Sequence, residues 1–304
     1  MTEIIGYIRE YLTQVNKKVL LLCTLQTAAF IYLNYSHHLE KRITSAALLP
    51  WPPFTGHFLI FIIAFALPYF FYWLIEKKNY FVNKPFASLV VVSAATFALK
   101  MALNTHFPLS SDATWNEYWN QILYWPIRVV ILSSILYLVW KRFDPEQPFY
   151  GLTIKNLNWR PYVLMLAIML PLIMAASTQE DFLTTYPKLQ SSLSVTGQLS
   201  WFHKLLFELS YGTDFFSVEI FFRGFLILAF LKWAGKDALL PMACFYCTIH
   251  FGKPLGECIS SYFGGLILGI VVYHTRSIWG GLMVHLGIAW LMEVGGYVGN
   301  ILKH

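Results

Sequence analysis

The stretch Ser217–Gly224 reads S-V-E-I-F-F-R-G and places two ionisable side chains, Glu219 and Arg223, inside an apolar and aromatic segment. Residues four apart share one face of an α-helix, so these two side chains can pair directly. Charged side chains are costly within a bilayer and normally face a protein interior or a water-filled cavity, which makes them candidates for function. A structural ion pair that joins two helices is the other interpretation, and the octapeptide favours neither.

The composition around this stretch indicates a membrane protein. Of the 304 residues, 57% are hydrophobic and 12% are charged, and the mean hydropathy is +0.53. Soluble proteins carry about 25% charged residues. Several apolar runs reach the roughly 20 residues that span a bilayer as a helix. We therefore expect an all-α, polytopic membrane bundle of eight to nine transmembrane helices, near residues 18–36, 57–76, 85–103, 119–140, 161–177, 213–232, 237–251, 258–274 and 278–300.

Charges at the ends of the apolar runs predict the orientation of the chain. Residues 1–18 mix acidic, basic and apolar side chains, which favours an amphipathic helix at the cytoplasmic face. Basic pairs such as Lys77-Lys78 and Lys141-Arg142 follow alternate spans, and they are typical of topology anchors rather than of a nucleic-acid site. Lys41 and Arg42 run against this alternation. We expect a multi-pass protein of the bacterial cytoplasmic membrane with a cytoplasmic N-terminus, in contact with membrane lipids.

The polar residues divide the chain into two parts of one integral membrane unit. Residues 1–142 hold the N-terminal helix and accessory spans, whereas residues 143–304 form a core that carries the candidate site. Lys100 lies near the end of its span, where its ammonium can snorkel to the interface. We expect the histidines outside the candidate site to be interfacial or solvated, namely His37, His38, His57, His106, His203, His274 and His304.

The four cysteines do not suggest a disulfide framework. Cys244 and Cys247 form a C-x-x-C with His250 three residues later, a spacing that metal ligands can adopt. Cysteine in an apolar helix is more often a small buried hydrophobe, and we favour that interpretation here. Cys23 and Cys258 lie apart from this motif.

Ionisable residues gather in the last four predicted spans. Antiparallel helices of these lengths bring Glu219, His250, Glu257 and His285 to one depth, beside Arg223. A glutamate beside a neutral imidazole can activate water, and a second histidine can donate to a developing oxyanion. Alternatively, His250, His285 and Glu219 would be a zinc ligand set with an open position for water. The sequence does not separate these two chemistries, and a divalent metal such as zinc stays an open cofactor.

At these residues the chain resembles the CAAX-protease and bacteriocin-processing family of intramembrane endopeptidases. The matching motifs are Val218-Glu219-x-x-x-Arg223-Gly224, Tyr246-x-x-x-His250 and His285-x-x-x-Ala289, within a likeness that covers about residues 143–294. The resemblance implies a membrane peptidase in which a glutamate and a histidine activate water. A second histidine and an asparagine would then stabilise the oxyanion. It also implies a peptide or lipid-modified protein as the substrate.

Two positions depart from the family motifs. The first glutamate of the family's pair is Val218 here, and the asparagine is Ala289. Either Glu219 turns towards the site, or Glu257 supplies the carboxylate from the next helix. Adjacent residues on a helix point about 100° apart, so Glu219 reaches the direction of Val218 only if the helix rotates. This favours Glu257, although it can instead form a rim pair with Lys253.

The sequence therefore leads to an intramembrane endopeptidase as the first hypothesis. His250 with Glu257 or Glu219 would activate water, His285 would bind the oxyanion or a metal, and Arg223 would keep Glu219 ionised. The second hypothesis, from Val218 and Ala289, is a catalytically silent scaffold or bacteriocin-immunity-type protein of the same fold. A transporter is a third and weaker possibility, because the two halves show no inverted duplication. The sequence does not give the oligomeric state.

Overall fold

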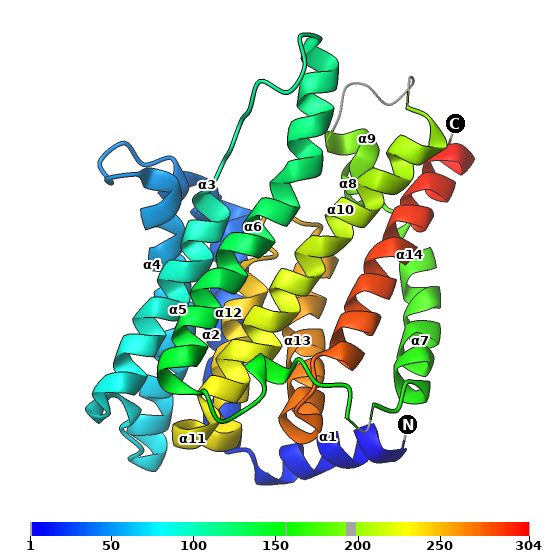
Figure 1. Ribbon diagram of the computed structural model, residues 1–304. Coiled ribbons are helices and arrows are strands. Elements are labelled where there is room, and N and C mark those ends of the chain that lie inside the picture. Colours follow the sequence, from blue (N-terminus) through cyan, green and yellow to red (C-terminus); the bar gives the residue numbers. More distant parts are fainter. Residues whose placement is uncertain (1, 156, 193–198, 304) are drawn as a thin grey trace.

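A computed structural model describes residues 2–155, 157–192 and 199–303. The described residues form helices joined by turns and loops, without a strand (Figure 1). The elements are α1 (Thr2–Gln14), α2 (Lys17–His37), α3 (Leu39–Thr44), α4 (Pro52–Glu76), η1 (Tyr80–Val82), α5 (Lys84–Ala102), α6 (Ala113–Phe143), η2 (Phe149–Gly151), α7 (Arg160–Ala176), α8 (Glu180–Thr185), α9 (Lys188–Ser192), α10 (Trp201–Glu219), η4 (Ile220–Ala229), α11 (Leu231–Ala234), η5 (Gly235–Ala238), α12 (Leu239–Thr248), α13 (Leu255–Thr275) and α14 (Trp279–Lys303).

The expected polytopic helical bundle is confirmed. Six of the described helices, α2, α4, α5, α6, α13 and α14, are long and apolar enough to cross a membrane. Three further predicted spans correspond to α7, which is shorter, to α10 continued by η4, and to α12, which has 10 residues. Apolar side chains on the outside of the bundle, such as Leu138 and Leu172, remain exposed, as expected of a surface that faces lipid.

Polar caps fix where several helices begin. The side chain of Asn16 accepts hydrogen bonds from the first amides of α2, and Asn83 does the same for α5. Asp112 accepts from Thr114 and Trp115 at the start of α6. These side chains satisfy amides that have no partner within the helix, so each helix starts at a defined residue.

The N-terminal helix lies across one end of the bundle rather than along it (Figure 1). Its inner face buries Ile4 and Tyr11, whereas Ile5 and Leu12 on the outer face are exposed. The ring of Tyr7 stacks on His274 of α13 at 4.3 Å between centroids. This arrangement agrees with the amphipathic helix that the sequence predicts.

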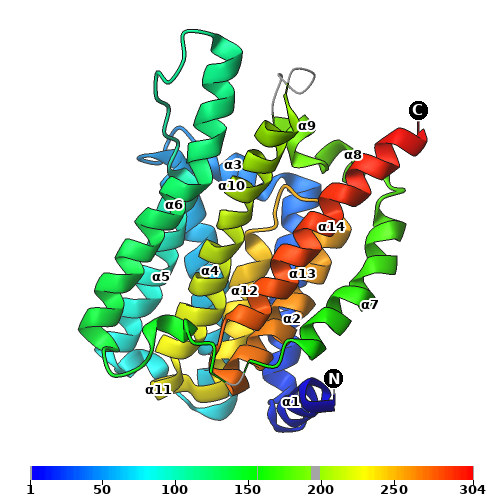
Figure 2. The same cartoon turned by 45° about the vertical axis from the view of Figure 1, so that its right-hand side comes forward.

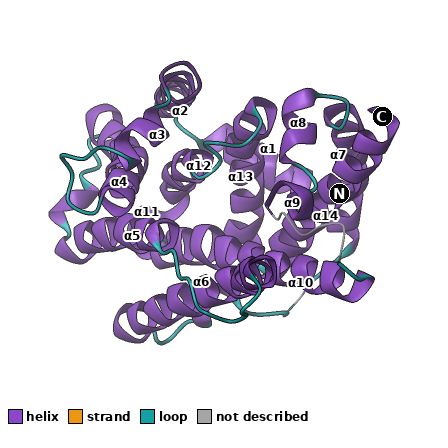
Figure 3. Ribbon diagram, turned by 90° about the horizontal axis from the view of Figure 1, so that it is seen from above, coloured by secondary structure: helices purple, strands orange, loops and turns teal. Residues whose placement is uncertain are grey.

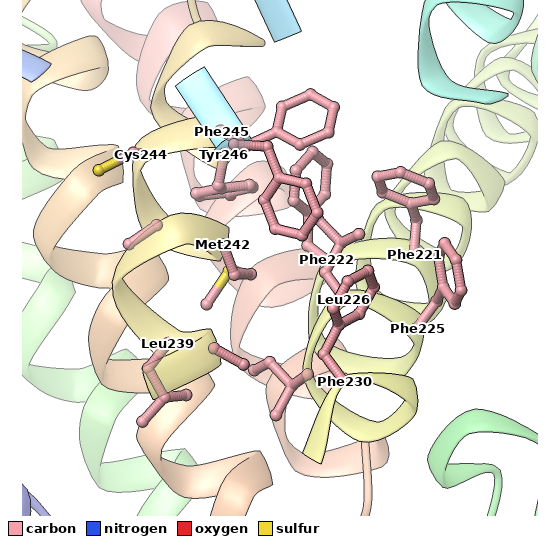
Figure 4. Packing of buried hydrophobic residues seen from close by; sticks show 14 of the residues in the cluster. Phe221, Phe222, Phe225, Leu226, Phe230, Leu239, Met242, Cys244, Phe245 and Tyr246 are labelled. Atoms are coloured by element: carbon pink, nitrogen blue, oxygen red, sulfur yellow. The ribbon is translucent and has the colours of Figure 1, made fainter. Parts of the chain in front are cut away.

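Helix α12 is the centre of the bundle. Seen from above, it lies in the interior among α2, α4 and α13 (Figure 3), and all of its residues are buried. Its aromatic side chains pack against those of η4 in the main hydrophobic core, where Phe222 faces Phe245 and Tyr246 (Figure 4). The helix thus holds the residues that follow it, including His250, in a densely packed setting.

Glycines let α13 approach α12 closely. A Cβ atom on Gly265 would lie 2.5 Å from a ring carbon of Tyr246, so only glycine fits there. The neighbouring Gly264 has no atom within 4 Å of that position. Of this adjacent pair, therefore, Gly265 makes the helix contact and Gly264 does not.

Two expectations about buried polar groups are wrong. Lys100 does not snorkel: its side chain is 4% exposed, and its ammonium pairs with Asp214 Oδ1 of α10 at 2.8 Å. The Lys100 side chain is buried, so an acidic partner stabilises its charge. His57 is also buried, and its Nε2 lies 3.2 Å from Glu40 of α3.

Replacing Gly265 by Ala should lower the stability, whereas replacing Gly264 by Ala should not. The added methyl at 265 collides with Tyr246, and such overpacking costs about 1–3 kcal/mol. At 264 the methyl meets open space, and alanine is the better helix former. Thermal unfolding in detergent micelles checks this, and equal melting temperatures for the two variants would contradict the packing described.

The Lys100–Asp214 pair should behave as a buried ion pair in a double-mutant cycle. Asp214→Asn leaves the Lys100 charge buried and uncompensated and should cost about 3–5 kcal/mol. Lys100→Met should cost less, because 27% of the Asp214 side chain is exposed. The double variant should recover much of this loss. Lys303→Met is the matched control, because its partner Glu180 is 4.0 Å away and exposed. Additive losses in the double variant would show that the two charges do not interact.

Candidate active site

The candidate site begins at the junction of α10 and η4, where the helix geometry changes. Helix α10 ends at Glu219, and η4 continues it as a π-helix through Ile220–Ala229. Such wide turns are rare and occur frequently at functional sites. Val218 packs into the apolar core, while the carboxylate of Glu219 turns to α14. Of the two carboxylates that the sequence offered in place of Val218, Glu219 is the one that meets a histidine.

Glu219 and His285 form a hydrogen bond inside the bundle. Nδ1 of His285 donates to Glu219 Oε1 at 2.9 Å. The carboxylate has no exposed surface, and 14% of the His285 side chain is exposed. A Cβ on Gly281 would lie 2.7 Å from Glu219 Oε2, so glycine at the start of α14 makes room for the carboxylate. Since Nδ1 carries the proton, a neutral His285 presents Nε2 as an acceptor.

Arg223 neutralises the buried carboxylate. Its Nη1 lies 3.2 Å from Glu219 Oε1, and neither side chain is exposed. The guanidinium also stacks over the ring of Tyr246 at 3.9 Å. The guanidinium thus places an opposite charge beside the buried carboxylate. The pairing that the sequence predicts between Glu219 and Arg223 is therefore present.

Tyr246 contacts both histidines. The sequence predicted it only as the aromatic residue of a motif and not as a member of the site. Its hydroxyl lies 3.2 Å from His285 Nε2. Its backbone carbonyl accepts from Nδ1 of His250 at 3.1 Å, and the Tyr246 and His250 rings are 4.7 Å apart. Its position four residues before His250 was the signal, because those residues share one face of a helix.

Glu257 belongs to a second network at the rim. Its carboxylate accepts a hydrogen bond from the Tyr186 hydroxyl at 3.0 Å and lies 3.4 Å from the Lys253 ammonium. Lys253 also donates to the Tyr186 hydroxyl at 2.8 Å. The rim pair with Lys253 is thus present, and Tyr186 joins it from the connection between α8 and α9.

The described residues do not assemble a metal site. Within residues 2–155, 157–192 and 199–303, no three His, Cys, Asp or Glu side chains converge so as to hold a metal ion. In the proposed set of His250, His285 and Glu219, the carboxylate of Glu219 is engaged by His285 Nδ1 and by Arg223, and the three side chains do not converge on one point. The donors present therefore do not fit zinc as they stand.

The four cysteines are buried thiols that lie near one another in two pairs. The sulfur atoms of Cys247 and Cys258 are 3.9 Å apart across the contact of α12 with α13. Cys244 lies against Cys23 of α2. All four are buried and free of disulfides, in agreement with their interpretation as small hydrophobes.

Comparisons with known proteins agree with the motifs. A protein-family model described as Type II CAAX prenyl endopeptidase Rce1-like matches residues 209–291, a range that includes Glu219, Arg223, His250, Glu257 and His285. Searches of curated proteins and of solved structures found no significant match. Residues 209–291 are therefore similar to an Rce1-like segment, in agreement with the family that the motifs resemble.

Proposed function

We propose that this protein is an intramembrane endopeptidase that cuts a peptide or a C-terminal segment of a membrane-associated substrate. The observation that carries the proposal is the 2.9 Å hydrogen bond between Glu219 and His285, buried among apolar helices. A carboxylate that orients an imidazole, with a further hydroxyl at the other nitrogen, is an arrangement suited to general-base catalysis. The family match supports this class of reaction.

In the proposed reaction, His285 is the base. Its Nε2 takes a proton from a water molecule as the water oxygen adds to the peptide carbonyl. Glu219 stabilises the imidazolium that forms, since its carboxylate already accepts from Nδ1. The imidazolium then gives the proton to the leaving amine as the C–N bond breaks. The products are a carboxylic acid and an amine, and no cofactor enters the balance.

Tyr246 is the proposed partner of the oxyanion. Its hydroxyl lies 3.2 Å from the reactive nitrogen of His285, and the stacked Arg223 makes its surroundings electropositive. A hydroxyl at this place can donate to the oxygen of the tetrahedral intermediate. It would replace the donor that is lost with Ala289. This assignment moves base catalysis from His250, which we expected from the sequence, to His285.

The alternative is a silent relative that binds a peptide or a lipid-modified partner without cutting it. Val218 and Ala289 at the family's catalytic positions favour it. Glu219 weakens it, because a carboxylate still reaches a histidine at hydrogen-bond distance. The two proposals make opposite statements about turnover, so a cleavage assay separates them.

We also propose that the N-terminus lies on the cytoplasmic side of a bacterial cytoplasmic membrane. Helix α1, α11 and the connection between α6 and α7 lie at the same end of the bundle (Figures 1 and 2). These segments and their flanks carry many basic residues, including Lys17, Lys141 and Lys232. An excess of basic residues at one end is typical of the cytoplasmic side.

Removing the base should abolish turnover while the fold is retained. We expect His285→Ala and Glu219→Gln to lower kcat for peptide cleavage by about 10²–10⁴, the usual contribution of general-base catalysis. His250→Ala should lose less, because its Nδ1 holds a backbone carbonyl. The measurement is cleavage of a fluorogenic peptide library by the purified protein in detergent.

Circular dichroism and size-exclusion profiles of each variant serve as folding controls. Full activity in His285→Ala, or a complete loss confined to His250→Ala, would contradict the assigned base. A wild-type protein that binds peptides of the library but cuts none would favour the silent relative.

A further inference from the structure

Glu293 is a buried carboxylate that the proposed reaction does not use. It lies on α14, and its residue surface is 6% exposed. Its Oε2 accepts from the backbone amide of Lys188 at 2.7 Å. Its Oε1 is buried and, among the described residues, has no hydrogen-bond partner. An unsatisfied buried carboxylate oxygen is costly, so it points to a group that binds there.

The position of Glu293 relates it to the candidate site. Gly281, His285, Ala289 and Glu293 recur every four residues and form a row that winds slowly around α14, by about 40° per step. Glu293 is eight residues beyond His285, which corresponds to about 12 Å along the helix. The one member between them, Ala289, has a small side chain. A peptide that lies along this row would meet both His285 and Glu293.

A second carboxylate faces the same region from α10. Glu208 has a buried Oε2 without a hydrogen-bond partner in the described part of the chain. Glu208 precedes Gly212 by about one helical turn on α10. The two helices pack together, since a Cβ on Gly212 would lie 3.4 Å from Leu286. Two carboxylates with open acceptor positions favour a cationic ligand.

Two lysines near these glutamates have partners of their own. The Lys253 ammonium is engaged by Glu257 and by the Tyr186 hydroxyl. Lys188 holds Glu293 through its backbone amide, while its ammonium stands 5.5 Å from the centre of the Tyr186 ring. When all are ionised, the three glutamates outnumber the two lysines.

We propose that Glu293, with Glu208 opposite, binds the cationic side chain of a lysine or arginine in the substrate peptide. The inference rests on the proposed function and names the class of its substrate. An extended peptide advances about 3.3 Å per residue, so 12 Å corresponds to three or four residues. The basic residue lies that far from the bond that is cut.

The test uses the full-length protein in detergent and peptides in which one lysine is moved through the sequence. Norleucine at the same position gives an uncharged peptide of similar shape. We expect lysine to raise kcat/KM at least about tenfold over norleucine at one position, three or four residues from the cut bond. In Glu293→Gln this ratio should fall to within about twofold. Glu180→Gln, which changes an exposed carboxylate, should keep the wild-type ratio.

Each outcome decides the inference. It is overturned if the wild-type protein does not distinguish lysine from norleucine, or if Glu293→Gln keeps the preference. If Glu293→Gln does not fold, the ratio in Glu208→Gln decides, and an unchanged ratio there overturns the role of the carboxylate pair. If no peptide is cut, binding of the fluorescent peptides is measured instead. If binding depends on lysine and Glu293→Gln removes that dependence, the subsite is supported although the endopeptidase proposal fails. If binding does not depend on lysine, the subsite is overturned.

Discussion

The buried group of Glu219, His285 and Arg223 constrains the helices that surround it. A carboxylate without exposed surface must be neutralised and hydrogen-bonded, because an unpaired charge in this setting costs several kcal/mol. The histidine on α14 and the arginine in η4 supply these contacts from two directions. The three helical segments cannot then slide past one another without breaking a charged contact. This requirement explains why glycine stands at 281, where a side chain would displace the carboxylate.

The second determinant is the central position of α12. Tyr246 takes part in the site with its hydroxyl, its ring and its backbone carbonyl, and Gly265 of α13 lets the ring sit against the neighbouring helix. A short, fully buried helix is suited to this role because packing on all sides fixes its rotamers. Away from α12, the Lys100–Asp214 ion pair joins α5 to α10, the helix that ends at Glu219.

The sequence predicts the fold class well because long apolar runs and scarce charges have few other interpretations. It also predicts Glu219, His250, Glu257 and His285 at one level beside Arg223, from the antiparallel order of the spans. The pairing within that group was harder to predict. An ideal α-helix directs Glu219 away from the Val218 position, whereas the π-helical continuation after Glu219 breaks that geometry. The pattern of residues does not predict such a turn.

Other differences between the predictions and the structure also arise from contacts between residues that are distant in the sequence. Lys100 lies near a helix end, where a lysine usually snorkels. In the structure it instead forms an ion pair with Asp214, 114 positions later in the chain. Tyr186 comes from a connection outside the family match and joins Glu257 and Lys253 at the rim. Contacts between residues so distant in sequence depend on how the helices pack. The division into residues 1–142 and 143–304 stays a prediction.

The most direct test of the account is the protonation state of His285. In protein labelled with ¹⁵N at histidine, nuclear magnetic resonance distinguishes the two neutral tautomers. A neutral His285 should carry its proton on Nδ1, and Glu219→Gln should change this signal while the signal of His250 stays the same. A His285 with the proton on Nε2, or one that does not respond to Glu219→Gln, would contradict the central hydrogen bond.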